Sequence, residues 1–310
     1  MLKKMGIYRG INLGGWLSQC DYSDERLNEF IKEADFAKIA GWKLDHVRIP
    51  VDYNVLDDGR GYEKLDFAVE MCRKYGLKMV LDLHKTAGFS FDKGEAETGF
   101  FDSESYQERF YVLWEDLARR YGHMTDLLVF ELLNEVTEPR FIDVWNHVSN
   151  EAIRRIRAIA PEVIVLVGSY WNNSASSVKD LAAPYDDKVL YNFHCYEPIA
   201  FTHQGAYWVD SLDRNARVPF EESGTTEEYF ENLFASAIET AEKNNTILYC
   251  GEYGVIDQAT PEDTVKWLKV INAVLEKHGI ARALWSYKAM DFGMSDARMD
   301  GVREELLRYL

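Results

Sequence analysis

Two glutamates in this sequence stand where apolar segments end, and that placement suggests chemistry. Glu135 follows the apolar run LLVFELL (127–133), and Glu252 lies within YCGEYGV (249–255). Burying a carboxylate at such a position is costly in free energy unless the group has partners or a task. Two carboxylates facing each other in a wide pocket can hydrolyse a glycosidic bond, one as a proton donor with a raised pKa and the other as an ionised nucleophile. Glu135 and Glu252 are therefore the candidate catalytic pair.

Other polar or aromatic residues also follow apolar runs. These candidates are Arg48, Asp82, His84, Asn134, His194, Tyr196 and Trp285. Arg48 and Tyr196 can hold Glu252 ionised, because nearby positive charge and donated hydrogen bonds both favour a carboxylate. That leaves Glu135 as the better acid/base. Asn134 can donate to a substrate 2-hydroxyl, a contact that strengthens in an oxocarbenium-like transition state.

Eight short apolar segments must position these residues. Their runs do not alternate cleanly with polar residues, which is typical of strands covered on both faces. The predicted strands are 6–13, 44–49, 77–83, 127–133, 163–168, 188–193, 246–250 and 281–286.

Helical patterns lie between these strands. The predicted helices are 24–40, 65–75, 103–121, 140–159, 226–244 and 261–278, with shorter ones at 174–182 and 301–310. Thr225 with Glu228 resembles a capping box, and Thr260 before Pro261 resembles an N-cap followed by a first-turn proline.

Strand–helix alternation repeated eight times predicts an α/β fold, a (β/α)8 TIM barrel, in a single catalytic domain over 1–310. Catalytic residues of such a barrel lie at the carboxyl ends of its strands. The aromatic-rich, aperiodic stretch 199–225 is expected to form an inserted loop or small subdomain at the barrel mouth after strand six. A doubly wound open sheet is the main alternative, but LGG (13–15) is a weak substitute for its glycine-rich phosphate loop.

Composition narrows the class of partner. A net charge of −17 repels phosphate backbones and anionic lipids, so neither nucleic acid nor a membrane is an expected partner. No run of 18 apolar residues occurs, so no membrane-spanning helix is expected. The four cysteines are scattered and form no CxxC pair, which argues against a zinc site or a disulfide framework. The oligomeric state is open, with a monomer favoured.

Seven segments, in order along nearly the whole chain, resemble glycoside hydrolase family 5 of the (β/α)8 clan A. They are GINLGGW (10–16), HVRIPVDY (46–53), LDLH (81–84), LLNEV (132–136), NFHCYEP (192–198), YCGEYGV (249–255) and LWSYKAMDF (284–292). The resemblance implies a retaining mechanism with Glu135 as acid/base and Glu252 as nucleophile. It also implies that Arg48, His84, Asn134, His194, Tyr196 and Trp285 occupy the family's other active-site positions.

Within that family the chain is most similar to clostridial-type β-1,4-endoglucanases with an insertion after strand six. The expected function is an endo-β-1,4-glucanase, a cellulase acting on β-glucan polysaccharide or oligosaccharide without a cofactor. Mixed-linkage β-1,3-1,4-glucanase, β-mannanase and exo-β-1,3-glucanase activities on the same machinery stay open, as does a non-catalytic sugar-binding barrel. The substrate class favours secretion, but MLKKMGIYRG contains no segment like a signal peptide, so cytoplasmic action on imported oligosaccharides is the alternative.

Flat aromatic rings are candidate platforms for sugars, because a pyranose ring has an apolar face. The candidates are Trp16, Trp171, Tyr207, Trp208 and Trp285. The histidines show no HxH or HExxH spacing, so no metal site is predicted.

Overall fold

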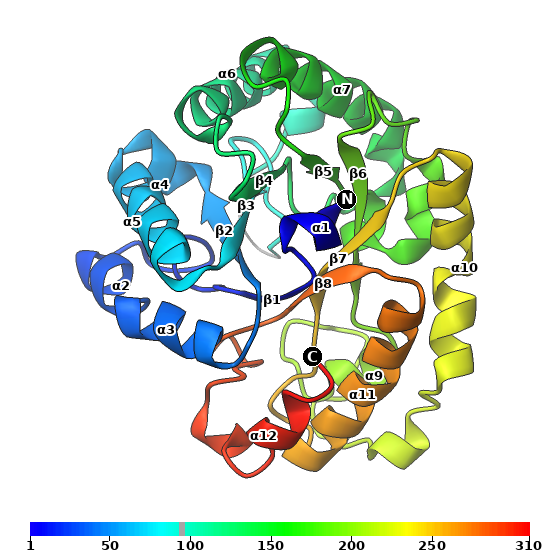
Figure 1. The fold of residues 1–310 in the computed structure, drawn as a ribbon. Coiled ribbons are helices and arrows are strands. Elements are labelled where there is room, and N and C mark those ends of the chain that lie inside the picture. The colour runs from blue at the N-terminus through cyan, green and yellow to red at the C-terminus, as the bar shows by residue number, and fades with distance from the viewer. Residues whose placement is uncertain (93–96) are drawn as a thin grey trace.

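Eight parallel strands close into a barrel in the order β1 to β8, as the sequence predicts (Figure 1). The computed structural model describes residues 1–92 and 97–310. The strands are β1 (Arg9–Asn12), β2 (His46–Asp52), β3 (Lys78–Lys85), β4 (Leu128–Glu131), β5 (Val165–Val167), β6 (Val189–Cys195), β7 (Leu248–Tyr253) and β8 (Ala281–Leu284).

Helices surround the barrel (Figure 1). The α-helices are α1 (Leu2–Met5), α2 (Asp24–Glu29), α3 (Glu33–Gly41), α4 (Tyr53–Asp57), α5 (Arg60–Tyr75), α6 (Glu104–Tyr121), α7 (Ile142–Ile159), α8 (Tyr170–Asn173), α9 (Ile199–Thr202), α10 (Glu227–Lys243), α11 (Pro261–Lys277) and α12 (Arg303–Leu306). The short 3₁₀ segments of the described residues are η1 (Phe100–Asp102), η2 (Pro139–Phe141), η3 (Ala175–Asp180), η4 (Phe220–Glu222) and η5 (Ala297–Met299). The predicted short helix at 174–182 is thus a 3₁₀ segment.

The predicted helix 24–40 is two helices. Its apolar spacing is preserved, since Leu27 and Ile31 are both buried, but the backbone breaks between α2 and α3. Lys32 has an extended conformation, and its N–H donates to the Asp35 side chain, which starts a second helix. Periodicity reports which face is buried, and it did not reveal this new start.

The predicted N-cap of α10 is one residue away from the observed one, and the predicted N-cap of α11 is confirmed. Thr226, not Thr225, caps α10 by accepting a hydrogen bond from the N–H of Tyr229. The Thr225 hydroxyl instead accepts from Ser223. Thr260 caps α11, with Pro261 as the first helical residue, as predicted.

The barrel interior has an apolar floor below a polar upper layer. Short α1 covers the floor, where Figure 1 shows it at the centre of the view, and Leu2 is buried there. The floor cluster also contains Ile7, Tyr8, Val80, Val129, Leu166, Leu190, Tyr249 and Ala283. Above it the interior residues are polar and buried: Asn12, Arg48, Asp82, Glu131, Asn192 and Glu252. The floor therefore supports a charged layer that faces the mouth.

The segment 199–225 follows β6 and contains only α9 and η4 as regular structure. Gln204 braces it, because its amide nitrogen donates to the carbonyls of Phe201 and Val218 and its oxygen accepts from the N–H of Val218. Across residues 1–92 and 97–310, no helix combines the length and the apolar character needed to cross a membrane.

Candidate active site

Pairing between β6 and β7 places two candidate residues side by side. The register shifts between Phe193 and His194, so that His194 pairs with Glu252. Gly251 allows this close approach, because a Cβ at this position would lie 2.7 Å from Asn192 Oδ1 and 3.0 Å from His194 Nε2. A glycine directly before the candidate nucleophile is therefore a packing requirement.

Glu252 accepts hydrogen bonds on both carboxylate oxygens. Arg48 donates from Nη1 to Oε1 at 2.7 Å, and the Tyr196 hydroxyl donates to Oε2 at 2.8 Å. Burial raises the pKa of Tyr196, so the phenol keeps its proton and acts as a donor. A cation and a donated hydrogen bond both favour the ionised form of a carboxylate, which a nucleophile requires. These are the two partners that the sequence predicted for Glu252.

Glu135 has a different environment. Burial raises its pKa to about 7, although the Asn172 hydrogen bond and the charges of His84 and Arg48 oppose that change. Its Oε1 lies 2.8 Å from His194 Nδ1, and its Oε2 accepts from Asn172 Nδ2 at 2.9 Å. A carboxyl group with a pKa near 7 is well matched to exchange protons at neutral pH.

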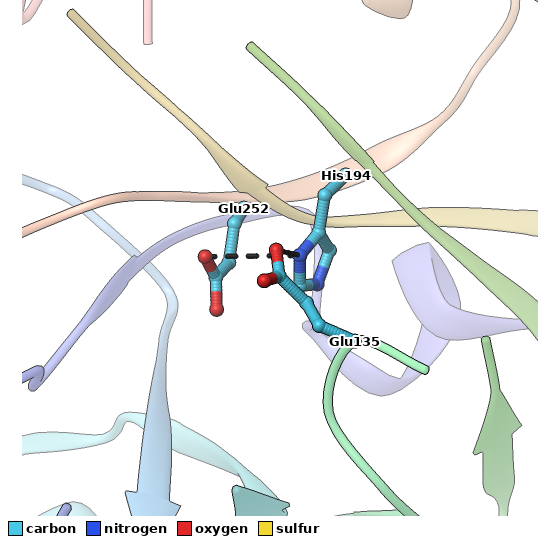
Figure 2. Close-up of side chains that lie close together, drawn as sticks. All are labelled: Glu135, His194 and Glu252. Carbon is cyan, nitrogen blue, oxygen red and sulfur yellow. Dashed lines mark hydrogen bonds and ion pairs between the residues drawn. The ribbon is translucent and has the colours of Figure 1, made fainter. Parts of the chain in front are cut away.

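The two carboxylates converge on one space. Figure 2 shows the side chains of Glu135 and Glu252 close together, with His194 beside both. One oxygen of each carboxylate and one ring nitrogen of His194 lie within 4.8 Å of one another. Retaining glycosidases hold their carboxyl groups about 5–5.5 Å apart, whereas inverting enzymes need about 6.5–9.5 Å to admit a water molecule. The close approach favours retention.

The same three groups have a spacing that can hold a metal ion. However, Glu252 already binds the guanidinium of Arg48, a cation that lies 2.7 Å from its Oε1. Burial lowers the pKa of His194 to about 4, so this imidazole is neutral near pH 7. A protonated acid, a neutral imidazole and an ion-paired carboxylate together fit proton transfer and nucleophilic attack.

Arg48 is the central cation of the polar layer. Its Nε and Nη2 donate to the two oxygens of Glu131 at 2.7 Å each, and Nη2 also lies 3.0 Å from Asp82. Asp82 in turn lies 2.7 Å from His84 Nδ1. Burial alone would lower the pKa of His84, but the Asp82 charge and hydrogen bond outweigh it and raise the value to about 9. His84 is therefore a second buried cation at neutral pH.

Asn134 is oriented by Arg48, whose Nη2 donates to Asn134 Oδ1 at 2.8 Å. Within the described residues, the buried Nδ2 of Asn134 has no hydrogen-bond partner. A buried amide donor without a partner costs free energy unless a ligand supplies an acceptor. This orientation suits the predicted donation to a sugar hydroxyl.

The aromatic candidates differ in exposure. Trp171 is 56% exposed, beside Asn172. Trp285 is buried, and its ring is parallel to that of His84 with centroids 5.8 Å apart. Trp208 is half-buried and is connected to Tyr196 through ring contacts with His203.

Trp16 does not fit the predicted role of sugar platform. It is fully buried, and its indole N–H donates to the carbonyl of Leu27. Its bulk belongs to the main core, so the prediction for Trp16 was wrong.

Sequence reasoning missed two residues that contact the site. Glu131 was treated as part of an apolar strand, although a carboxylate inside such a run is itself a signal of a buried partner. Asn172 lies in SYWNNS (169–174), where only its neighbour Trp171 was predicted to contact the sugar. No spacing in the sequence connects Asn172 with Glu135.

Comparison with known proteins identifies the family of this chain. The family model described as cellulase (glycosyl hydrolase family 5) matches residues 10–291. Cellodextrinase A of Ruminococcus flavefaciens is 63% identical over 91% of this chain and 86% of its own length. Endoglucanase C of Acetivibrio thermocellus is 37% identical over 97% of both chains.

Solved structures give the same result. The clostridial cellulose synthase subunit Z of Clostridioides difficile superposes with a TM-score of 0.83 and 28% identity, over 98% of this chain and 99% of that one. Endoglucanase Cel5A of Thermotoga maritima superposes with a TM-score of 0.81 and 26% identity, over 99% of this chain and 97% of that one. The chain therefore belongs to glycosyl hydrolase family 5, the cellulase family, and is an O-glycosyl hydrolase.

Proposed function

We propose that this enzyme cleaves β-1,4-linked glucans, including cellodextrins, within the chain and with retention of anomeric configuration. The observation that carries the proposal is the close approach of Glu135 and Glu252 in unequal environments, with the pKa of Glu135 raised to about 7. The cellodextrinase and endoglucanase names of the similar proteins support the choice of substrate.

In the first step a Glu252 oxygen attacks the anomeric carbon and forms a glycosyl ester. The bond from that carbon to the glycosidic oxygen breaks, and its electron pair stays with the leaving oxygen. Glu135 gives its proton to that oxygen, so the leaving sugar departs as a neutral alcohol. Arg48 and Tyr196 each donate a hydrogen bond to the Glu252 carboxylate, one to each oxygen, and so hold the nucleophile in place.

In the second step water attacks the same carbon from the opposite face. Glu135, now ionised, takes a proton from this water, and the ester bond to Glu252 breaks with its electron pair returning to the carboxylate. Two inversions give net retention, and both glutamates return to their starting protonation states.

The surrounding residues bind the sugar. Asn134 donates to the 2-hydroxyl from its Nδ2, which has no hydrogen-bond partner among the described residues. The remaining contacts come from His84, His194, Trp171, Trp208 and Trp285.

Proton NMR of early products tests the stereochemistry. Hydrolysis of cellotetraose should give the β-anomer first, and initial release of the α-anomer would contradict the proposal.

A reducing-sugar assay on carboxymethylcellulose, barley β-glucan, laminarin and glucomannan tests the linkage. The highest kcat/KM is expected on β-1,4-glucan, and a preference for laminarin or glucomannan would reassign the substrate. Glu252→Gln serves as the inactive control. Sugar binding without turnover by the wild type would indicate a binding protein.

A further inference from the structure

Three consecutive residues after β5 have left-handed backbone conformations. Trp171, Asn172 and Asn173 have φ values of 48°, 54° and 56°. Asparagine adopts this region more readily than most residues, but a tryptophan there is strained. Backbone strain of this kind persists where the surrounding structure fixes it, and it often accompanies a functional site.

Hydrogen bonds fix this turn against the segment that carries Glu135. The N–H groups of Trp171 and Asn172 donate to the carbonyls of Thr137 and Val136, at 3.2 Å and 3.0 Å. Glu135 itself has a φ of 46°. Backbone hydrogen bonds thus join the segment that carries the acid/base to the turn, and both segments have unusual backbone conformations.

Asn172 brings the turn into contact with the chemistry. Its Nδ2 lies 2.9 Å from Glu135 Oε2, while Glu135 Oε1 faces His194. An amide N–H can only donate, so it favours a proton-free Oε2 and fixes the plane of the carboxyl group. The neighbouring Trp171 is exposed on the same turn.

We propose that Asn172 is a positioning residue for the reaction, holding the Glu135 carboxyl group in the orientation and acid strength that protonation of a poor leaving group needs. The inference rests on the proposed function of the glutamate pair. Without Asn172, Glu135 is a weaker acid, and its carboxyl group is no longer held in one orientation by this hydrogen bond. The loss falls on the step that needs a proton donor, and therefore on substrates whose leaving group is a sugar.

Other charged or titratable groups also face Glu135 from the strands and loops around it. They are Arg48, His84, Asp92, His194, Tyr196 and Glu252. All of them remain in an Asn172 variant, so a change in the proton affinity of Glu135 is attributable to the lost amide.

Two variants remove the donor without straining the turn. Asn172→Gly suits a φ of 54° and deletes the side chain, and Asn172→Asp keeps the shape but replaces the donor with an acceptor. The alkaline limb of kcat/KM against pH should move up by about one unit in Asn172→Gly and further in Asn172→Asp.

Leaving-group dependence separates acid positioning from general damage. At the wild-type optimum, kcat/KM for cellotetraose should fall about tenfold in Asn172→Gly, a part of the 10²–10⁴-fold that a general acid supplies. With 2,4-dinitrophenyl cellobioside, whose leaving group needs no proton, the change should stay within about twofold. Equal losses on both substrates, or an unmoved alkaline limb, would overturn the proposal.

Asn146→Ala is the matched control. Asn146 also uses its amide near this loop, bonding to backbone groups of Asp180 and Ala182, but it does not touch Glu135. Its pH profile and leaving-group ratio should equal those of the wild type.

¹³C NMR titration of labelled glutamate side chains, assigned with Glu135→Gln, measures the Glu135 pKa without turnover. An unchanged Glu135 pKa in Asn172→Gly would refute the inference, whether or not the wild type hydrolyses glucan. Failure of the wild type to hydrolyse any glucan would refute the proposed function instead.

Discussion

The Nη1 nitrogen of Arg48 lies 2.7 Å from Oε1 of Glu252, so the candidate nucleophile forms a direct ion pair with a buried guanidinium. The same guanidinium binds Glu131 through two hydrogen bonds and lies 3.0 Å from Asp82. One cation is thus shared by three buried carboxylates. The position of the Glu252 carboxylate therefore depends on a network that also supports the folded barrel.

Replacing Arg48 by Met should destabilise the protein by about 3–5 kcal/mol, because it leaves buried carboxylates without their counter-charge. Urea unfolding at pH 7 measures this change. At pH 5 the loss should be smaller, since carboxylates that lack a cation take up protons more readily. A variant as stable as the wild type at pH 7 would show that the network adds no net stability.

Glu135→Gln should lower kcat/KM for cellotetraose by about 10²–10⁴-fold, because the leaving oxygen then departs without a proton. For 2,4-dinitrophenyl cellobioside the formation of the glycosyl-enzyme should persist, and a burst of dinitrophenol in stopped flow detects it. Glu252→Gln is the control and should show no burst. A burst from Glu252→Gln but none from Glu135→Gln would exchange the two roles.

The pH profile should show an alkaline limb near 7. Burial raises the pKa of Glu135 to about 7. The first step requires the protonated form, so kcat/KM should fall as the pH rises through this value. Initial rates on cellotetraose between pH 4 and pH 9 measure the limb. Persistence of the limb in Glu135→Gln would assign it to another group.

Stability should fall as the pH rises from about 6.5 to 9. Burial alone would lower the pKa of His84, but Asp82 outweighs it and raises the value from 6.5 to about 9. A base whose pKa is higher in the folded state contributes its full stabilisation below the unfolded value and loses it as the pH passes the folded value. The contribution is of the order of 3 kcal/mol. Urea unfolding at pH 6 and pH 9 measures it, and His84→Asn should show a flatter dependence.

Trp171→Ala should lower kcat/KM for cellotetraose by about three- to tenfold, as expected for the loss of one aromatic contact. Trp171 is 56% exposed, so stability should change by less than about 0.5 kcal/mol. Tyr185→Ala is the matched control, since Tyr185 is also an exposed aromatic at 49% but lines a shallow groove with Asn146 and Leu181. Equal activity losses in both variants would remove the platform role from Trp171.

Most of the site residues could be predicted from the sequence because they follow the ends of predicted strands. Residues directly past apolar runs, such as Arg48 and Tyr196, meet Glu252 because closure of a parallel barrel gathers all carboxyl ends at one mouth. The rule needs only strand order and polarity, both of which are visible in a single sequence.

Features that depend on backbone detail could not be predicted in this way. The break before α3 depends on a hydrogen bond from the Lys32 N–H to the Asp35 side chain, and the contact of Asn172 with Glu135 depends on a left-handed turn. Trp16 shows a third limit, because a tryptophan near a strand end fits a platform and a core equally well until its neighbours are known.

The helix α1 covers the barrel floor, and the C-terminal carbonyl of Leu310 accepts a hydrogen bond from Arg282 at the start of β8. Leu2 and Leu310 therefore both lie on the side of the barrel away from the catalytic glutamates. An affinity tag, a fusion partner or an immobilisation linker attached at either end would point away from incoming polysaccharide, so the enzyme can be tethered to a solid support without obstructing its substrate.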